Sequence, residues 1–506
     1  LGKKIKDGDY SIFPQRDRNW GWESEGFTSI ASFSGDNTRT ERSFMFKDES
    51  GLFIYRGYYV GSEIIGGHYF TDDMPYTRNK EKTLKITYKC ENNEIYVNQY
   101  ISVFSDSDVF SFSNEIVNLS DKTLFVDRIM SMQLDFIANK ASVMTFDGSW
   151  ARERKKHVSE VNAGTFLIDA KEGYSSSKHN PFFIADINNN GYLAVNLLWS
   201  GNHKEVIDIN ENNRLRVLAG INDYNFSYKL EKGKTLRSPE AIAVMEKNLD
   251  DITSEMHSFV LNHVIPERFN GMERPTLVNN WEGTYFDFTP EKLLAIADKA
   301  SEVGLDMFVL DDGWFGKRIN DKAGLGDWYD NVEKTCDLRK FKEELKKRNL
   351  KFGLWIEPEM INPDSDLYRA HPEYVMQIPG VQPLFKRSQL VLDYANREVC
   401  DYIVNAIGKI LDEVHPDYIK WDNNRFMTDV YSSVLSYQGG YYYDYTLGYY
   451  YVAKRLTERY PEILFEGCAS GGNRFDLGVA FYMPQSWCSD NADAKSRTFI
   501  QEGTLY

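Results

Sequence analysis

The first half of the chain has the short alternating pattern of β-strands. Apolar and polar residues alternate over residues 84–88, and a compact apolar run covers residues 192–198, directly after the turn cluster at 188–191. Runs of this length, bounded by Asn and Gly, are typical of strands. Because no helical period separates them, residues 1–245 are predicted to form an N-terminal all-β sandwich domain.

After residue 245 the pattern changes twice. Residues 249–264 are polar with spaced apolar positions, so a linking helix is expected within residues 246–272. From residue 273 to 506, continuous apolar strands alternate with amphipathic helices. This order is typical of a parallel sheet covered by helices, and residues 273–506 are predicted to form a catalytic (β/α) barrel.

One helix of this second half can be delimited closely. Thr289 is placed to cap it, Pro290 fits its first position, and Gly304 fits its end. About six strands can be counted in this half, whereas a closed (β/α)8 TIM-type barrel has eight. The barrel is therefore expected to be incomplete at its C-terminus, as if truncated before its last strands.

Acidic residues recur where the predicted strands end. Any single one is more often a surface or capping carboxylate, but the carboxyl ends of barrel strands meet at one face, where active sites lie. We therefore expect an acidic pit there, ringed by tryptophans. The strand-end acids are Asp311, Asp312, Glu357, Glu359, Asp422, Glu466 and Asp490. The expected ring comprises Trp281, Trp314, Trp355, Trp421 and Trp487.

Three kinds of function suit such a pit: glycoside hydrolysis by two carboxylates, metal-dependent hydrolysis, and sugar binding without catalysis. None of the eight histidines lies at these strand ends, and no HxH or HExxH motif occurs, which disfavours the metal site. Lys420 precedes Asp422 by two residues and shares its face of the strand. A cation there would keep Asp422 ionised, as a nucleophile requires.

Composition narrows the choice of partners. The net charge of -16 argues against nucleic acid or an anionic membrane as a partner. The five cysteines are scattered without CxxC spacing, which favours a reducing, cytoplasmic location. No apolar run reaches the length of a membrane span, and no Gly-rich phosphate loop follows a strand. Neither a cofactor nor a metal is expected.

Several motifs resemble those of glycoside hydrolase family 36, the microbial α-galactosidases, and they follow its order. The barrel motifs are NNWE at 279–282, LDDGWFG at 310–316, GDW at 326–328, WIEPEM at 355–360, KWDNNR at 420–425 and the segment 468–476. The sandwich motifs are DGSWARER at 147–154, SSKHNP at 176–181, SGN at 200–202 and SPEA at 238–241. The resemblance covers roughly residues 101–506 and is poor before that.

The resemblance implies roles for individual residues. It makes Asp422 the nucleophile and Asp490 the general acid/base of a retaining, double-displacement mechanism. It also implies a set of sugar-binding residues: Trp281, Asp311 and Asp312 for the galactose 4- and 6-hydroxyls, Trp355 for the pocket wall, Arg387, Lys420 and Asn424 for the ring hydroxyls, and Cys468 and Gly471 for the 2-hydroxyl. Family members carry a further β-domain after the barrel and commonly form homotetramers; this sequence is expected to stop before that C-terminal β-domain, as it does before the last barrel strands.

The expected function is therefore hydrolysis of terminal α-galactosyl residues from oligosaccharides such as raffinose or melibiose. Two alternatives keep the same fold: an α-N-acetylgalactosaminidase and a raffinose-type transglycosylase. Two others belong to different classes: a metal-dependent barrel hydrolase and a non-catalytic sugar-binding protein. The last would need one catalytic acid to be lost, and both Asp422 and Asp490 are present.

Overall fold

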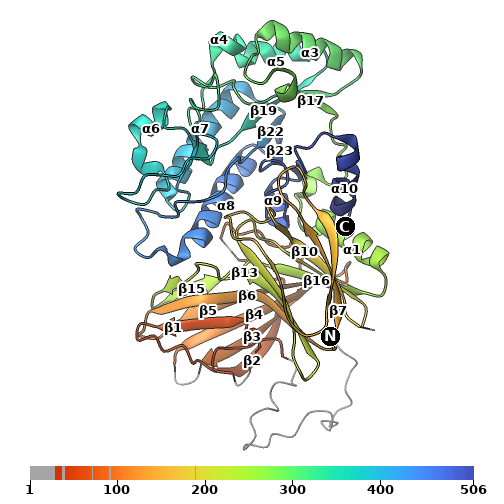
Figure 1. The fold of residues 1–506 in the computed structure, drawn as a ribbon, viewed down its shortest axis with the longest axis vertical. Helices are drawn as coiled ribbons and strands as arrows, with labels where there is room; N and C mark the ends of the chain where they lie inside the picture. The colour runs from red at the N-terminus through yellow and green to blue at the C-terminus, as the bar shows by residue number, and fades with distance from the viewer. Residues whose placement is uncertain (1–28, 37–39, 71, 91–92, 189) are drawn as a thin grey trace, which may run out of the picture.

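The computed structural model describes residues 29–506 except 37–39, 71, 91–92 and 189. Residues 1–28 of the predicted sandwich and Asn189 of the predicted turn lie outside this part. The described chain forms two stacked parts, an all-β part followed by an α/β part (Figure 1). The predicted fold class, an N-terminal β-region followed by a catalytic-type α/β domain, is confirmed.

The all-β part is a sandwich of two antiparallel sheets. The smaller sheet contains, in order, β1 (Phe44–Asp48), β6 (Leu124–Ile137), β13 (Arg214–Ile221), β12 (His203–Ile209) and β9 (Gly164–Asp169), with β14 (Tyr228–Leu230) paired to β6. The larger contains β2 (Gly57–Gly66), β3 (Lys82–Cys90), β4 (Ile95–Val103), β5 (Phe110–Asn118), β16 (Ala241–Glu246), β11 (Tyr192–Leu197), β10 (His179–Asp186), β7 (Ala141–Asp147) and β8 (Lys155–Val161), with β15 (Lys234–Arg237) paired to β5.

Helix α1 (Leu249–His263) connects the two parts and packs against β16 and β11. Its buried residues Ile252, Met256 and Phe259 lie on one face at helical spacing. No helix in the described part of the chain is long and apolar enough to cross a bilayer.

The α/β part is built on a parallel sheet. Its strands, in both chain and sheet order, are β17 (Leu277–Asn279), β18 (Met307–Leu310), β19 (Lys351–Ile356), β22 (Tyr418–Trp421), β23 (Leu464–Gly467) and β24 (Gln485–Ser486). The helices between them are α3 (Pro290–Glu302), α5 (Leu338–Lys346), α7 (Arg397–Val414), α8 (Tyr441–Arg459) and α9 (Leu477–Tyr482). The strand count of six agrees with the sequence, and no pairing joins β17 to β24 among the described residues.

The α/β part contains further elements, most of them short. They are η2 (Glu267–Phe269), α2 (Trp281–Thr284), α4 (Val332–Thr335), α6 (Asp366–Ala370), η3 (Pro372–Tyr374), η4 (Gln438–Gly440), α10 (Ala494–Thr504) and the antiparallel pair β20 (Met360–Ile361) and β21 (Leu390–Val391). Most of them lie in loops that follow the carboxyl ends of strands, the edge of the sheet at which polar side chains were expected.

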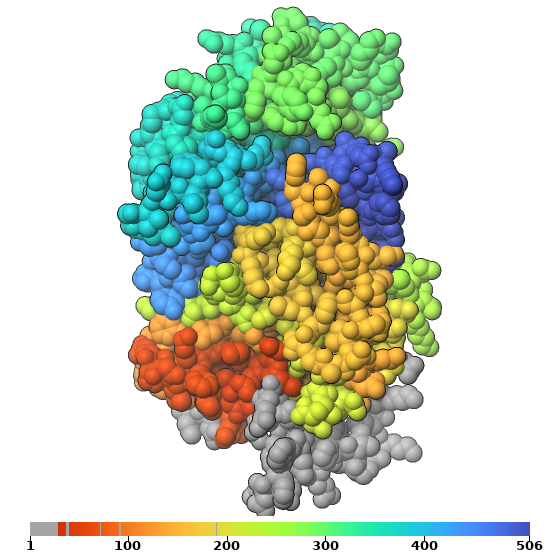
Figure 2. Space-filling view, in the orientation of Figure 1, coloured from red at the N-terminus to blue at the C-terminus, as the bar shows by residue number. Residues whose placement is uncertain are grey.

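The two parts make extensive contact. Asp476, at the start of α9, accepts hydrogen bonds from the sandwich hydroxyls of Ser175 and Ser200 at 2.5 and 2.8 Å. The hairpin formed by β7 and β8 projects from the sandwich and lies beside α10. In Figure 2 this hairpin forms part of the orange projection that rises next to the dark blue C-terminal residues. The sandwich thereby reaches the sheet edge at which the strands of the α/β part end.

Candidate active site

A cavity of about 1130 Å³ lies at the carboxyl ends of the parallel strands. Residues that follow strands β17, β18, β22, β23 and β24 line it, together with Trp355 near the end of β19. Two lining residues, Trp150 and Tyr174, come instead from the sandwich. Both parts of the chain therefore form the cavity. The α/β part supplies most of its polar groups, and the sandwich supplies one wall.

The structure brings nearly all of the predicted site residues into this one cavity. Those that line it are Trp281, Asp311, Asp312, Trp355, Arg387, Lys420, Asp422, Asn424 and Asp490. They come from five different strand ends and from the loop that carries Arg387, so the fold, rather than local sequence, assembles them.

Cys468 and Gly471 are not among the residues that line the cavity. The Cys468 side chain is buried, and burial together with the neighbouring Asp422 charge raises the pKa of its thiol well above the usual range. Gly471 has a φ of 80°, and a Cβ atom there would lie 2.8 Å from the backbone nitrogen of Asp490. A glycine is required at this position because the loop that carries it lies against the loop that carries Asp490. Ala469 and Ser470 form the cavity wall in this region.

Asp422 directly follows β22 and is almost completely buried. One carboxylate oxygen accepts hydrogen bonds from the backbone nitrogens of Asn423 at 2.8 Å and Ser470 at 3.1 Å. The other accepts from the Trp355 indole at 3.1 Å and the Asn424 amide at 2.8 Å. Burial alone would raise the pKa of Asp422, but Lys420 and the hydrogen bonds from Asn424, Cys468 and the Asn423 backbone outweigh it and lower the pKa, which favours the ionised carboxylate.

Asp490 lies on the same cavity, after β24, in the opposite electrostatic situation. Burial raises the pKa of its carboxyl, and the negative charge of Asp422 raises it further. Two indole N–H groups contact it: Trp150 donates to one oxygen and Trp487 to the other, each at 3.0 Å. The cavity thus contains two carboxyl groups whose pKa values are shifted in opposite directions, that of Asp422 downwards and that of Asp490 upwards.

Asp311 and Asp312, which follow β18, have different partners. Asp311 accepts hydrogen bonds from Lys420 at 3.3 Å and from Asn279. Asp312 forms a two-point ion pair with the buried guanidinium of Arg318, in which both distances are 2.8 Å. The cation bound to Asp311, Lys420, itself lines the cavity. Both oxygens of Asp312 are instead bound by Arg318, which does not line the cavity.

Not every strand-end acid faces the cavity. Glu466 lines it, but Glu357 and Glu359 lie beneath. The two terminal guanidinium nitrogens of Arg474 donate to Glu359, at 2.8 and 3.0 Å, so this acid has a structural role. Glu357 accepts the backbone N–H of Asn424 at 2.6 Å, and burial followed by the Asp422 charge raises its pKa to about 8. It supports the loop that carries the Asp422 donors.

The predicted tryptophan ring is partly wrong. Trp281, Trp355 and Trp487 line the cavity, but Trp314 and Trp421 are fully buried beneath it. Their indoles donate inward, Trp314 to the carbonyl of Trp355 and Trp421 to Glu359. Both indoles find their hydrogen-bond partners in the core, which explains why they do not face the cavity.

Trp150 was not predicted as a site residue, although it lies within one of the motifs of the sandwich. No periodicity or spacing connects residue 150 to a loop more than 300 positions later, so its place could be found only from the fold. Across the part of the chain that the structure describes, no group of three or more His, Cys, Asp or Glu side chains is arranged to hold a metal ion.

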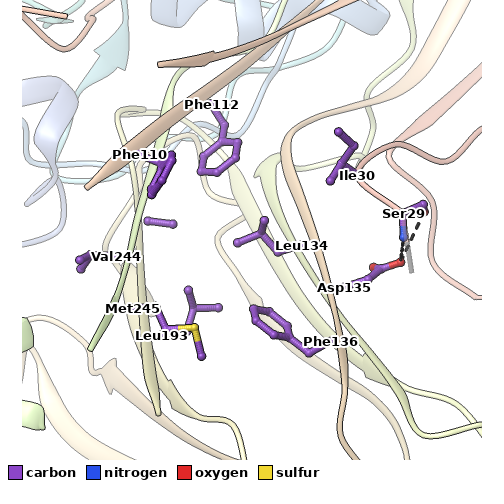
Figure 3. Close-up of a pocket in the computed structure, with 11 residues that line it drawn as sticks. Ser29, Ile30, Phe110, Phe112, Leu134, Asp135, Phe136, Leu193, Val244 and Met245 are labelled. Carbon is purple, nitrogen blue, oxygen red and sulfur yellow. Dashed lines mark hydrogen bonds between the residues drawn. The ribbon is translucent and has the colours of Figure 1, made fainter. Parts of the chain in front are cut away.

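A second, smaller cavity of about 290 Å³ lies within the sandwich, lined by strands of both sheets (Figure 3). Its lining is mainly apolar, with Phe110, Phe112, Leu134 and Phe136 around it. The acid at its edge, Asp135, is paired with Arg216 at 2.8 Å. This arrangement offers no pair of free polar groups for chemistry, and the larger cavity is the candidate active site.

Two family models together match almost all of the chain. The family model described as Melibiase matches residues 235–506, and that described as the glycosyl hydrolase family 36 N-terminal domain matches residues 13–231. The second match begins well before residue 101, so the likeness extends further towards the N-terminus than the sequence motifs indicated. None of the described residues before residue 101 lines the cavity, so this part of the chain carries no site motif.

Individual relatives agree with these matches. α-Galactosidase Mel36A of Lactobacillus acidophilus is 40% identical over 444 residues, which cover 85% of this chain and 61% of that protein. Two crystal structures of α-galactosidase AgaA variants from Geobacillus stearothermophilus, in complex with stachyose and with raffinose, each match 100% of this chain and 73% of theirs. Their identities are 33% and 32%, and their TM-scores 0.95 and 0.94. The chain spans about three-fifths of the length of Mel36A.

Proposed function

Because this chain belongs to glycoside hydrolase family 36, we propose that it forms the catalytic site of a retaining α-galactosidase. Its substrates are oligosaccharides with a terminal α-galactosyl residue, such as raffinose or melibiose. The observation that carries the proposal is the pair of acids on one cavity: Asp422, whose pKa is lowered, and Asp490, whose pKa is raised. This division suits a nucleophile and a general acid.

The reaction proceeds by double displacement. The protonated Asp490 carboxyl donates its proton to the leaving glycosidic oxygen while an Asp422 oxygen attacks the anomeric carbon, forming a galactosyl-enzyme ester. Asp490, now ionised, then removes a proton from water, which attacks the same carbon and releases Asp422. Two inversions give net retention. The four donors to Asp422 hold its carboxylate in a fixed orientation, which reduces the reorganisation needed for attack.

The remaining cavity residues bind the sugar. Asp311, Asp312 and Trp281 contact the 4- and 6-hydroxyls, and Arg387, Lys420 and Asn424 contact the ring hydroxyls. Trp355 has two tasks, because its ring lines the cavity while its N–H binds Asp422. Cys468 and Gly471 do not line the cavity, but they shape its wall on the side assigned to the 2-hydroxyl. Substrates like those bound by the AgaA variants fit this assignment.

A substrate panel tests the proposal. The purified protein is expected to hydrolyse p-nitrophenyl α-galactoside, with at least ~100-fold lower kcat/KM for the β-galactoside and the α-glucoside. Proton NMR should show α-galactose as the first product. Preference for the N-acetylgalactosaminide would indicate the related N-acetyl-specific activity, and oligosaccharide products from raffinose a transglycosylase. Loss of activity in EDTA would instead indicate a metal-dependent hydrolase.

The Asp311→Asn variant is expected to lose much of its preference for galactose over glucose. The sugars differ at the C4 hydroxyl, and a buried acceptor left unpaired costs about 1–3 kcal/mol, which corresponds to roughly 5- to 150-fold in kcat/KM. The measurement is the ratio of kcat/KM for the p-nitrophenyl α-galactoside and α-glucoside. Near-wild-type kcat/KM and an unchanged ratio in Asp311→Asn would remove Asp311 from the binding site.

Asp312→Asn is the matched comparison for this test. It changes the neighbouring carboxylate, but it also leaves the buried Arg318 without its counter-charge. It is therefore expected to lower the free energy of unfolding by about 3–5 kcal/mol as well as kcat/KM, whereas Asp311→Asn leaves that ion pair intact.

Assembly and location extend the proposal. The edge strand β2 exposes Tyr59, Val60 and Ile64, and the preceding residues Phe53 and Ile54 are exposed as well. An apolar sheet edge of this kind favours burial against another subunit, which supports a homo-oligomer. The five cysteines are free thiols, three of them buried, which fits a reducing compartment such as the cytoplasm. Size-exclusion chromatography with light scattering tests the first point.

A further inference from the structure

The loop that joins β7 and β8, residues 148–154, leaves the sandwich and closes over the segment that carries Asp490. This segment, residues 488–491, follows β24 and is not part of a regular element. Its conformation is therefore not fixed by helix or sheet bonds of its own. We name the sandwich loop, residues 148–154, the clamp loop. Its hydrogen bonds to residues 488–491 help to fix the conformation of that segment.

Each residue of the segment has a bond to the clamp loop. Arg154 donates to the carbonyl of Cys488 at 3.0 Å, and the Ser489 hydroxyl donates to Glu153 at 2.6 Å. Trp150 donates to the Asp490 carboxylate at 3.0 Å. Asn491 donates through its amide to the carbonyl of residue 151, also at 3.0 Å.

Glu153 is at the centre of these contacts. Its side chain is buried, and one oxygen accepts the Ser489 hydroxyl while the other accepts the backbone N–H of Ala151 at 3.0 Å. The Ser489 hydroxyl in turn accepts the backbone N–H of Asn491 at 3.1 Å. A single carboxylate thus connects the turn of the clamp loop to the residues on both sides of Asp490.

The packing around Glu153 leaves little freedom for another arrangement. A Cβ atom on Gly471 would lie 2.8 Å from a Glu153 oxygen and 2.8 Å from the Asp490 nitrogen, so all three groups are in close contact. Ala151 and Arg154 both adopt positive φ, at 60° and 49°, which is costly for residues with a side chain. The bonds of Glu153 stabilise this otherwise unfavourable turn.

We propose that Glu153, a residue of the sandwich, is a positioning residue that holds the general acid/base Asp490 in place through Ser489. This inference rests on the proposed function and adds to it a residue of the other domain. Glu153 is not among the residues that line the cavity, so it acts on the position of Asp490 and not on the sugar. A displacement of about 1 Å at a reacting group can lower the rate on the order of 100-fold.

The test uses two substrates that differ in their need for an acid. Methyl α-galactoside requires protonation of its leaving oxygen, whereas the fluoride ion departs from α-galactosyl fluoride without protonation. For both substrates, kcat/KM reports the first step, formation of the galactosyl-enzyme. Glu153→Ala is expected to lower kcat/KM for the methyl galactoside on the order of 100-fold and for the fluoride only a few-fold. Glu153→Gln, which keeps an acceptor oxygen, should recover most of the activity.

Two further variants complete the design. Ser489→Ala removes the same bond from the other side and decides the outcome if Glu153→Ala does not fold. Glu240→Ala is the control, because Glu240 is also a buried carboxylate of the sandwich but binds Thr77 and Lys80, away from the segment. It should lower the melting temperature while affecting both substrates equally.

The outcomes separate the two proposals. A loss confined to the methyl galactoside in Glu153→Ala and Ser489→Ala supports a positioning role. A parallel loss on both substrates, as in Glu240→Ala, would show that Glu153 is only structural, with Asp490 still the acid. If Asp490→Ala itself lowers both substrates in parallel, the assignment of the acid fails, and the role of Glu153 fails with it.

Discussion

Replacing Asp422 with Gly is expected to lower α-galactoside turnover by on the order of 10⁵- to 10⁶-fold, the scale on which loss of a covalent nucleophile acts. Azide should then restore turnover, because it fits the space left by the carboxylate and attacks from the same face. A single displacement inverts the anomeric carbon, so the product is β-galactosyl azide. Proton NMR of the product distinguishes the two anomers.

The α-azide as the rescued product would remove Asp422 from the nucleophile role. Glu466→Gln is the matched control, since Glu466 is another acid that lines the same cavity and is bound by Gln485 at 2.6 Å. Whatever that change does to turnover, azide is not expected to yield the β-azide with it. The comparison distinguishes a reacting carboxylate from one that only contributes charge.

Replacing Asp490 with Ala is expected to lower kcat/KM for methyl α-galactoside about 10²- to 10⁴-fold, the usual contribution of a general acid. The same variant should cleave α-galactosyl fluoride at nearly the wild-type kcat/KM. With the fluoride as substrate, azide should accelerate turnover and give the α-azide, because this anion attacks the galactosyl-enzyme without a general base, whereas water needs the base that the variant lacks.

The pH dependence follows from the environment of Asp490. Burial and then the Asp422 charge raise its pKa, so wild-type kcat/KM for the methyl galactoside should fall at high pH as this carboxyl ionises. The Trp150 and Trp487 donors favour the ionised form. Trp487→Phe is therefore expected to raise the pKa and move the alkaline limb to higher pH. A limb that moves to lower pH, or one that persists in Asp490→Ala, would contradict the assignment.

Elements of the fold that depend on local signals were predictable from sequence. Thr289 caps α3 and Pro290 is its first residue, as expected, because capping is a local interaction. Helix α8 begins at Tyr441 without a side-chain cap of this kind. Its first turns are rich in tyrosines that are buried by tertiary contacts, so no amphipathic period marks them. Packing decides that helix, and packing is not visible in a single sequence.

The candidate site shows the same division. Strand ends predicted the meeting of Asp311, Asp422 and Asp490, because the topology of a parallel sheet brings these positions to one edge. The direction of a side chain beyond the strand was not predictable, and Glu359 and Trp421 therefore turned out to face each other inside the core. The contribution of the sandwich was also invisible, since nothing in residues 147–154 indicates which distant segment they contact.

The hydrogen bond between Trp150 and Asp490 constrains the evolution of the sequence in both domains. A domain that contributes neither predicted catalytic acid nevertheless touches one of them, so its clamp loop is exposed to the same selection as the active site. Drift in the two halves is then coupled, and a recombinant that joined the sandwich of one lineage to the barrel of another would inherit mismatched partners at this contact.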